Sequence, residues 1–225
     1  MKARKVICSI LGKYARYTLW FMRIEVSQKI KETVNSQNHL FVSNHLSYTD
    51  VLVICAHYPS CFVTSVEMKN TPFLGQICIL GGCLFVERRS KENLGQEVRD
   101  ITEALRAGLD VVIFPESTST NGEEVIRFRR PLFQAACDSK VNIKPLTLNY
   151  RYLSDEPVSL KNRDKVFWYG DMTFADHLWG LFKIKKIVVD LTVGDSLKVE
   201  EKQDLRFLAE LSHTLVRKNY DPVLC

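Results

Sequence analysis

The stretch SNHLSYTD, residues 43–50, places a histidine five positions before an aspartate. These are the two side-chain types that a general base and its orienting carboxylate require. An imidazole has an ordinary pKa of about 6.5, so it accepts a proton near neutral pH. A carboxylate hydrogen-bonded to the other ring nitrogen fixes the tautomer and favours the charged form. His45 and Asp50 are therefore a candidate catalytic pair.

The same stretch also fits a purely structural role. Ser47 and Asp50 form an S-x-x-D pattern, which is typical of a capping box at the start of a helix. Asp50 would then accept hydrogen bonds from backbone N–H groups and take no part in chemistry. The two interpretations are compatible, because one carboxylate can both cap a helix and orient an imidazole.

Two more polar blocks follow apolar runs that are typical of buried strands. FPESTS, residues 114–119, is a hydroxyl-rich turn, and GCLFVERR, residues 82–89, ends in two arginines. A guanidinium at a strand end suits a phosphate, which it binds through two parallel hydrogen bonds. The alternative for Arg88 and Arg89 is a solvated strand end. Because ligand sites of α/β proteins collect where strands end, we expect these blocks to meet there.

Hydrophobic periodicity predicts strands that alternate with helices along the chain. Polar loops separate them, including an Asn-Gly turn at 121–122 and a stretch from 151 to 165. This alternation predicts an α/β fold: a mixed, largely parallel central sheet flanked by helices, with an amphipathic helix at the N-terminus. The expected strands are 39–43, 62–66, 81–88, 110–114, 143–150 and 186–193, and the expected helices are 5–31, 48–57, 94–105, a short one from 131, 173–182 and 199–219.

The N-terminal segment carries most of the basic character. Residues 1–37 hold eight basic and two acidic side chains, so they contribute +6 and the remaining chain contributes −1 to the net charge of +5. Such a helix can lie in a membrane interface, or it can pack on the domain with a solvated basic face. We therefore divide the chain into a basic amphipathic membrane-interface helix, 1–37, and a domain, 38–225. The apolar stripe consists of Val6, Ile10, Tyr14, Tyr17, Phe21 and Ile24.

The totals exclude several classes of protein. With 46% apolar and 25% charged residues, the 225-residue chain is not disordered. Seven cysteines without a C-x-x-C pattern favour reduced thiols over a zinc site. The charge-free runs at 51–66 and 71–86 are shorter than the roughly 20 residues that span a bilayer, so no transmembrane helix is expected. A net positive charge confined to one segment favours an anionic surface and argues against nucleic acid.

Taken in order, the blocks NHLSYTD, GCLFVER, FPESTS and IKPL resemble those of the glycerolipid acyltransferase family, whose bacterial type is 1-acylglycerol-3-phosphate O-acyltransferase. The resemblance runs from about residue 38 to 195. It implies that His45 is the general base and that Asp50 is its partner. It also implies that the acceptor's polar head is held by Arg88 and by the loop of Glu116, Ser117, Thr118 and Ser119.

Two positions depart from the family's pattern. Ser117 stands where glycine is usual, which costs energy if the backbone there needs a positive φ. Ser119 stands where arginine is usual, so one phosphate contact is missing. Either Arg129 supplies it, or the acceptor is not a plain phosphomonoester, as in family members that acylate lyso-ornithine lipid. Glu87 in place of the family's aspartate is a milder change.

The resemblance implies a lyso-lipid O-acyltransferase. It would move a fatty acyl group from an acyl-CoA or acyl carrier protein thioester to the free hydroxyl of lysophosphatidate, making phosphatidate. The thioester is a co-substrate, and no metal or other cofactor is implied. The enzyme would lie peripherally or monotopically on the cytoplasmic face of the membrane, bound to anionic lipid through its N-terminal helix.

Two other functions compete with this one. The letters GDSL at 194–197 name an esterase family, in which Ser196 would be a nucleophile, although Asp195 and Ser196 also suit a cap of the last helix. A non-catalytic lipid-binding protein would keep the basic helix and the arginines but would need no base. Loss of turnover in His45→Ala would separate the acyltransferase from the binding protein.

Overall fold

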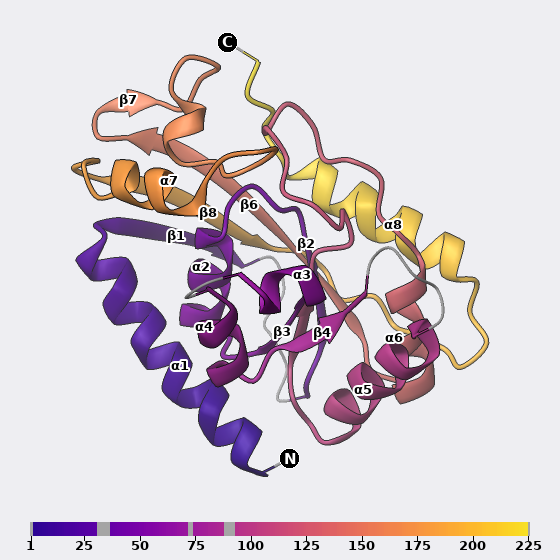
Figure 1. The fold of residues 1–225 in the computed structure, drawn as a ribbon. Coiled ribbons are helices and arrows are strands. Elements are labelled where there is room, and N and C mark those ends of the chain that lie inside the picture. Colours follow the sequence, from indigo (N-terminus) through magenta and orange to yellow (C-terminus); the bar gives the residue numbers. More distant parts are fainter. Residues whose placement is uncertain (1, 31–36, 72–73, 88–92, 225) are drawn as a thin grey trace.

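A computed structural model describes residues 2–30, 37–71, 74–87 and 93–224. Its centre is an eight-stranded sheet, in which seven strands follow the order β1-β8-β6-β2-β5-β3-β4 and the eighth, β7, pairs with β6 (Figure 1). The strands are β1 (Ile24–Ile30), β2 (Leu40–Ser43), β3 (Cys61–Ser65), β4 (Leu84–Val86), β5 (Val111–Ile113), β6 (Ile143–Leu153), β7 (Glu156–Pro157) and β8 (Ile187–Val193).

The predicted mixed, largely parallel sheet is confirmed. β6, β2, β5, β3 and β4 run parallel to one another, while β8 is antiparallel to β6 and β1 is parallel to β8. Every residue of β2 and β5 is buried, as expected for strands covered on both faces. β2 is central, so the residues that follow it emerge in the middle of the sheet edge.

Helices cover both faces of the sheet. They are α1 (Lys2–Phe21), α2 (Thr49–His57), α3 (Val66–Lys69), α4 (Leu74–Leu80), α5 (Leu94–Arg106), α6 (Gln134–Ser139), α7 (Phe174–Leu181) and α8 (Leu205–Lys218), with 3-10 turns η1 (Pro131–Phe133) and η2 (Arg163–Lys165).

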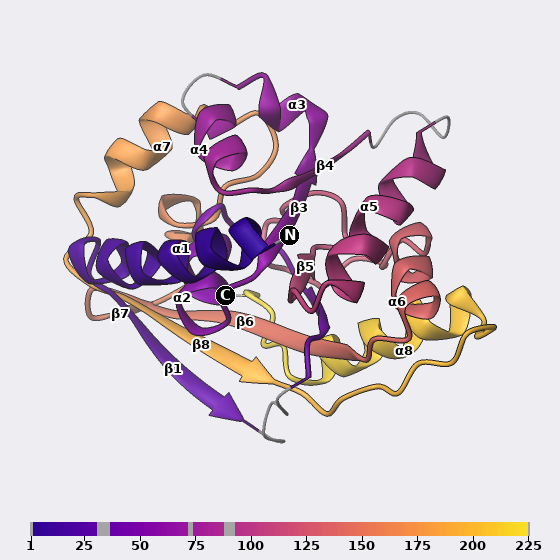
Figure 2. The ribbon, with the colours of Figure 1, turned by 90° about the horizontal axis from the view of Figure 1, so that it is seen from below.

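Two side chains on opposite faces of β6 show which helix covers each face of the sheet. Thr147 hydrogen-bonds the carbonyl of Val216 in α8, whereas the Tyr150 hydroxyl reaches Thr49 in α2. Because successive side chains of a strand point to opposite faces, α2 and α8 lie on opposite sides of the sheet. Figures 1 and 2 show α1 beside α2 at one flank of the molecule, and α5, α6 and α8 at the other.

The predicted helix over 5–31 is wrong beyond Phe21. Arg23 adopts φ 55°, which interrupts the helix, and residues from Ile24 form the edge strand β1. Each residue of β1 pairs with a residue of β8 that lies more than 160 positions away. A partner so distant in sequence cannot be read from local periodicity, and short helices α3 and α4 were also missed.

Other element predictions were confirmed with shifted ends. The last helix begins at Leu205, later than expected, because Asp204 caps it by accepting from the Arg206 N–H at 2.8 Å. Asp195 and Ser196 therefore do not cap it. The Asn-Gly turn is present, and Gly122 has a φ of 83°. The stretch 151–165, expected to be a loop, contains the end of β6, β7 and η2.

Candidate active site

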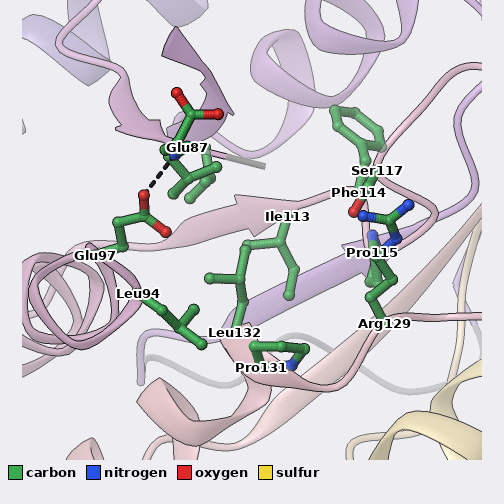
Figure 3. Close-up of a pocket in the computed structure, with 12 residues that line it drawn as sticks. Glu87, Leu94, Glu97, Ile113, Phe114, Pro115, Ser117, Arg129, Pro131 and Leu132 are labelled. Carbon is green, nitrogen blue, oxygen red and sulfur yellow. Dashed lines mark hydrogen bonds between the residues drawn. The ribbon is translucent and has the colours of Figure 1, made fainter. Parts of the chain in front are cut away.

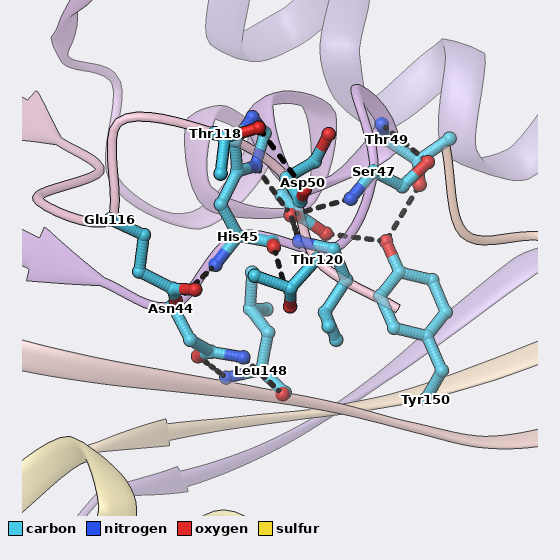
Figure 4. Close-up of polar contacts among 12 residues, drawn as sticks. Asn44, His45, Ser47, Thr49, Asp50, Glu116, Thr118, Thr120, Leu148 and Tyr150 are labelled. Atoms are coloured by element: carbon cyan, nitrogen blue, oxygen red, sulfur yellow. Dashed lines mark hydrogen bonds and ion pairs between the residues drawn. The ribbon is translucent and has the colours of Figure 1, made fainter. Parts of the chain in front are cut away.

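His45 and Asp50 are in direct contact, as the spacing predicted. The Nδ1 atom of His45 lies 2.9 Å from Oδ2 of Asp50 (Figure 4). His45 follows β2 by two residues, and Asp50 lies in the first turn of α2. The Asp50 side chain is fully buried, whereas 17% of the His45 side chain is exposed. The pair is therefore anchored in the protein at the carboxylate and open to a ligand at the imidazole.

The other contacts of Asp50 fix the tautomer of His45. The N–H groups of Leu46 and Ser47 donate to Oδ2 at 2.7 and 3.0 Å, and the Tyr150 hydroxyl donates to Oδ1 at 2.7 Å. Backbone amides can only donate, so the carboxylate acts as an acceptor throughout. Nδ1 of His45 then carries the hydrogen, and Nε2 is left as the proton acceptor. The bond to the Ser47 N–H shows that Asp50 also has the predicted capping role.

The bond from Tyr150 depends on the length of β6. In the parallel pairing, Ser43 at the end of β2 lies opposite Leu146, and β6 continues to Leu153. Tyr150 therefore stands beyond the end of β2 and reaches back to Asp50. Its hydroxyl also lies 2.6 Å from Oγ1 of Thr49. Since the Tyr150 hydrogen points to Asp50, Thr49 donates to Tyr150.

Asn44 and Trp168 hold the loop that carries His45. The Asn44 side chain donates to the carbonyl of Leu148 and accepts from its N–H, at 3.0 and 2.9 Å. This amide extends the β2–β6 pairing by one step past the last residue of β2 (Figure 4). On the other side, the backbone N–H of Trp168 donates to the Leu46 carbonyl at 2.9 Å. The stretch WYGDM, 168–172, thus packs against the site loop.

The loop after β5 forms the second wall of the site. The ring of Phe114 stacks on the imidazole of His45, with centroids 4.0 Å apart and planes inclined by 17°. The Thr120 N–H donates to the His45 carbonyl at 2.9 Å. Ser117 adopts φ 61°, the left-handed conformation that favours glycine. The strain expected from the sequence at Ser117 is present.

Glu116 is turned toward the protein interior. It is 2% exposed, and its Oε1 accepts from the His45 N–H at 3.0 Å. Burial raises the pKa of Glu116 to about 8, although the N–H groups of His45 and Ile126 oppose this shift. Glu116 therefore supports the backbone of His45. By contrast, Thr118 is exposed and Ser119 is half-buried.

A cavity of about 210 Å³ lies beside this loop, at the ends of β3, β4 and β5 (Figure 3). Phe114 lines it, so the cavity is separated from the imidazole by one ring. Arg129 and Ser117 lie at one end, and Glu87 and Glu97 lie at the other. The Glu87 N–H donates to the Glu97 carboxylate. The other walls of the cavity are mostly apolar and consist of Val63, Val86, Leu94, Ile113, Pro115, Pro131 and Leu132.

The structure brings together most of the residues that the sequence singled out. His45, Asp50, Glu116 and Ser117 are neighbours around one loop, and Arg129 borders the cavity with Ser117. Arg88 and Arg89 lie outside the described residues. Their predicted role in binding the acceptor's head stays a prediction, as do the ligand roles of Glu116, Thr118, Ser119 and Arg129.

Ser196 lies at the wrong end of the sheet for a nucleophile near His45. Its neighbour Leu197 bridges to Ile143, the first residue of β6. His45 instead follows the last residue of β2, to which β6 is parallel. The two positions are on opposite edges of the sheet, so Ser196 is not a nucleophile that His45 could activate.

Sequence reasoning missed Tyr150, Thr49 and the stacking role of Phe114. A weak signal for Tyr150 was present in the sequence. This residue ends the expected strand 143–150, and that strand was expected in the same sheet as the strand 39–43, which precedes His45. Sequence alone did not give the register between those two strands. Thr49 stands inside the SNHLSYTD block, where only the histidine, serine and aspartate had been assigned a role.

Comparisons with known proteins identify the family of this chain. Residues 23–149 match the family model described as Acyltransferase. A lyso-ornithine lipid O-acyltransferase of Rhizobium meliloti is 28% identical over 186 residues, which cover 80% of this chain and 64% of that protein. A 1-acyl-sn-glycerol-3-phosphate acyltransferase of Neisseria gonorrhoeae is 29% identical over 208 residues, covering 91% of this chain and 78% of that protein.

A solved structure shares the fold. The crystal structure of the 1-acyl-sn-glycerophosphate acyltransferase from Thermotoga maritima superposes with a TM-score of 0.67 and 16% identity. The match covers 96% of this chain and 79% of that one. At this identity the likeness supports the fold alone.

Proposed function

The chain belongs to the acyltransferase family, and from that premise we propose that it transfers a fatty acyl group from a thioester to the free hydroxyl of a lyso-lipid. The observation that carries the proposal is the contact between His45 and Asp50 at the carboxyl end of β2. It leaves Nε2 of His45 as the proton acceptor. No described residue hydrogen-bonds this atom.

The chemistry follows from this tautomer. As the acceptor hydroxyl attacks the thioester carbonyl, Nε2 of His45 takes the hydroxyl proton, and Asp50 stabilises the imidazolium that forms. The tetrahedral intermediate then collapses with cleavage of the carbon–sulfur bond. The leaving thiolate takes the proton from the imidazolium. Proton transfer by a positioned side chain typically raises the reaction rate about 10²- to 10⁴-fold.

Neighbouring residues position the base. Phe114 covers one face of the imidazole, and the backbone of His45 is held by Glu116 and Thr120. Restricting the imidazole to one orientation lowers the entropic cost of reaching the transition state. These residues act through His45, so we assign them a positioning role.

Lysophosphatidate is the first candidate acceptor, which would make the product phosphatidate and the pathway phospholipid synthesis. It is supported by the sequence resemblance and by the Neisseria gonorrhoeae relative. In this case Arg88, the loop of 116–119 and Arg129 would hold the phosphate. Arg129 borders the cavity next to the base, where a guanidinium suits a phosphate oxygen pair.

Lyso-ornithine lipid is the second candidate, and the charges in the cavity favour it. Among the described residues that line the cavity, Arg129 is the one cation, and it faces Glu87 and Glu97 across the apolar walls (Figure 3). The Glu97 carboxylate repels a dianionic phosphate, whereas a head that carries an ammonium and a carboxylate matches both ends. The serine at position 119 removes a further cation. The name of the Rhizobium meliloti relative, lyso-ornithine lipid O-acyltransferase, states this acceptor for that protein.

We also propose that α1 holds the enzyme on the cytoplasmic face of a membrane. Its buried face consists of Cys8, Gly12, Ala15 and Leu19, and Met22 just after the helix is buried too. The predicted apolar stripe is on the opposite side and faces solvent, with exposures of 58% for Val6, 62% for Tyr17 and 58% for Phe21. Ile24 is the exception, since it is buried in β1.

The surroundings of α1 support interfacial binding. Such a stripe, with exposed Lys5 and Lys13 on the same helix, is typical of a helix that lies in a lipid interface. The ring of Phe21 packs edge-on against the ring of Phe182, which follows α7, and their centroids are 6.0 Å apart. No helix in the described part of the chain combines the length and apolar character needed to cross a bilayer.

The test is an acyl-transfer assay on purified protein. Lysophosphatidate and lyso-ornithine lipid are each offered with palmitoyl-CoA and with palmitoyl-acyl carrier protein. We expect turnover with one acceptor, and a loss of about 10² to 10⁴ in His45→Ala. His57→Ala is the matched control, because His57 lies at the end of α2 and bonds the Val53 carbonyl. Turnover that survives in His45→Ala would rule out the proposed base, and no turnover with either lipid would rule out the proposed acceptors.

A further inference from the structure

A second and larger hollow adjoins the cavity beside the active site. It has a volume of about 1260 Å³ and is open to solvent. Its walls come from α5, the segment 127–131, α6 and the start of α8. We call it the arginine groove. The groove and the cavity share Leu94, Arg129 and Pro131 in their walls, so a bound molecule can extend from one into the other.

The arginine groove has uncompensated positive charge. Arg99, Arg127, Arg129 and Arg130 are exposed. No carboxylate within the described residues pairs with any of them, and Arg99 bonds only the neutral Gln96. A fifth arginine of the groove, at the start of α8, is neutralised by Glu210 at 2.8 Å.

The two acidic residues of the arginine groove accept hydrogen bonds from neutral donors, and their two charges offset only part of the charge of the four arginines. Asp204 caps α8 through the Arg206 N–H. Asp138 accepts from the Gln134 amide at 2.7 Å. Four guanidinium groups without a carboxylate partner in the described part of the chain thus surround one hollow, while the floor is apolar, with Leu94, Val98, Phe128, Pro131 and Leu205.

The arginine groove lies away from the surface proposed to meet the membrane. Figures 1 and 2 both place α5, α6 and α8 at the flank opposite α1. An anionic lipid surface bound at α1 therefore would not cover the groove. A water-soluble anion can occupy it while the acceptor reaches the site from the membrane.

We infer that the arginine groove binds the phosphate groups of the acyl donor's carrier, specifically the phosphorylated nucleotide end of acyl-CoA. This inference rests on the proposed thioester chemistry. Guanidinium groups bind phosphate oxygens in pairs, so Arg99, Arg127 and Arg130 suit the three phosphate groups of that nucleotide and leave Arg129 to the acceptor. The hollow is on the scale of small-molecule sites. The pantetheine arm then runs past Arg129 and Pro131 toward His45.

The experiment compares donors with and without the nucleotide. The double variant Arg127→Gln, Arg130→Gln is assayed with palmitoyl-CoA and with palmitoyl-pantetheine, and its affinity for CoA is measured by titration calorimetry. Removal of one hydrogen bond to a charged group lowers affinity about tenfold. We therefore expect the kcat/KM ratio of palmitoyl-CoA to palmitoyl-pantetheine to fall at least about tenfold, and the Kd for CoA to rise equally. High salt should reduce both differences.

Arg217→Gln is the matched control. Arg217 is exposed on α8, about 16 Å along the helix from the groove residue Arg206. An unchanged donor ratio and CoA affinity in the double variant would overturn the inference. So would an equal loss with both donors. Failure of the proposed function itself would appear separately, as absence of turnover in the wild type with every donor, and CoA binding still tests the groove in that case.

Discussion

The hydroxyl of Tyr150 donates to Oδ1 of Asp50 at 2.7 Å, across 100 residues of sequence. Asp50 thereby has a donor at each oxygen, and Oδ2 remains directed at His45. A buried carboxylate needs such partners, because an unpaired charge in the interior is costly. Tyr150 is therefore part of the catalytic arrangement although it does not reach the imidazole.

Tyr150→Phe tests this contact. The substitution leaves Oδ1 of Asp50 without its donor, which should lower the free energy of unfolding by about 1–3 kcal/mol. A loss of about 1.4 kcal/mol at the transition state would lower kcat about tenfold. The measurements are denaturant unfolding and kcat. Tyr152→Phe, on the same strand and 46% exposed, should change neither, and equal effects of the two variants would contradict the assignment.

Ser117→Gly should stabilise the protein. Ser117 has φ 61°, a conformation that costs a residue with a Cβ about 1–2 kcal/mol and glycine little. Part of this gain is lost to the greater freedom of glycine in the unfolded chain. We expect a net increase of about 0.5–1 kcal/mol in the free energy of unfolding, read as a rise of a few degrees in Tm. Ser119→Gly is the control. Its φ is not positive, so glycine there should lower Tm.

Glu116→Gln should change how stability depends on pH. Burial raises the pKa of Glu116 to about 8, whereas an unfolded glutamate titrates at about 4.3. Between these values the folded protein binds more protons than the unfolded one. Stability therefore falls as the pH rises through this range, at no more than about 1.4 kcal/mol per pH unit for one group.

Glutamine keeps the oxygen that accepts from the His45 N–H but cannot ionise. The variant should lose less stability than the wild type between pH 5 and pH 8, measured as Tm at several pH values. Glu103→Gln, at an exposed position on α5, should follow the wild-type curve. Parallel curves for wild type and Glu116→Gln would show that Glu116 does not titrate in this range.

Trp20→Ser with Tyr17→Ser should release the protein from membranes. These side chains are 72% and 62% exposed on α1, and transfer of each from water to the lipid interface is favourable. We expect the partition coefficient onto vesicles of phosphatidylglycerol and phosphatidylcholine to fall at least about tenfold. Co-sedimentation measures it. Phe207→Ser, 53% exposed on α8, is the control, and equal binding by all three proteins would exclude α1 as the contact.

Local sequence was sufficient for the elements that alternate regularly. β2, α2, β5 and α8 each carry a complete apolar pattern within a few residues, so their type followed from spacing. The His45–Asp50 contact also followed, because five positions span only the end of a loop and the first turn of a helix. The positive φ at Ser117 could be anticipated from a serine in a glycine position.

The tertiary structure decided everything that depends on partners far along the chain. β1 is a strand because β8 pairs with it, and Tyr150 reaches Asp50 because β6 extends past β2 in that particular register. Burial of Glu116 and exposure of the α1 stripe depend likewise on which surfaces the rest of the chain covers. Pattern and spacing determine local conformation, whereas register and burial are set by long-range packing, which a single sequence does not display.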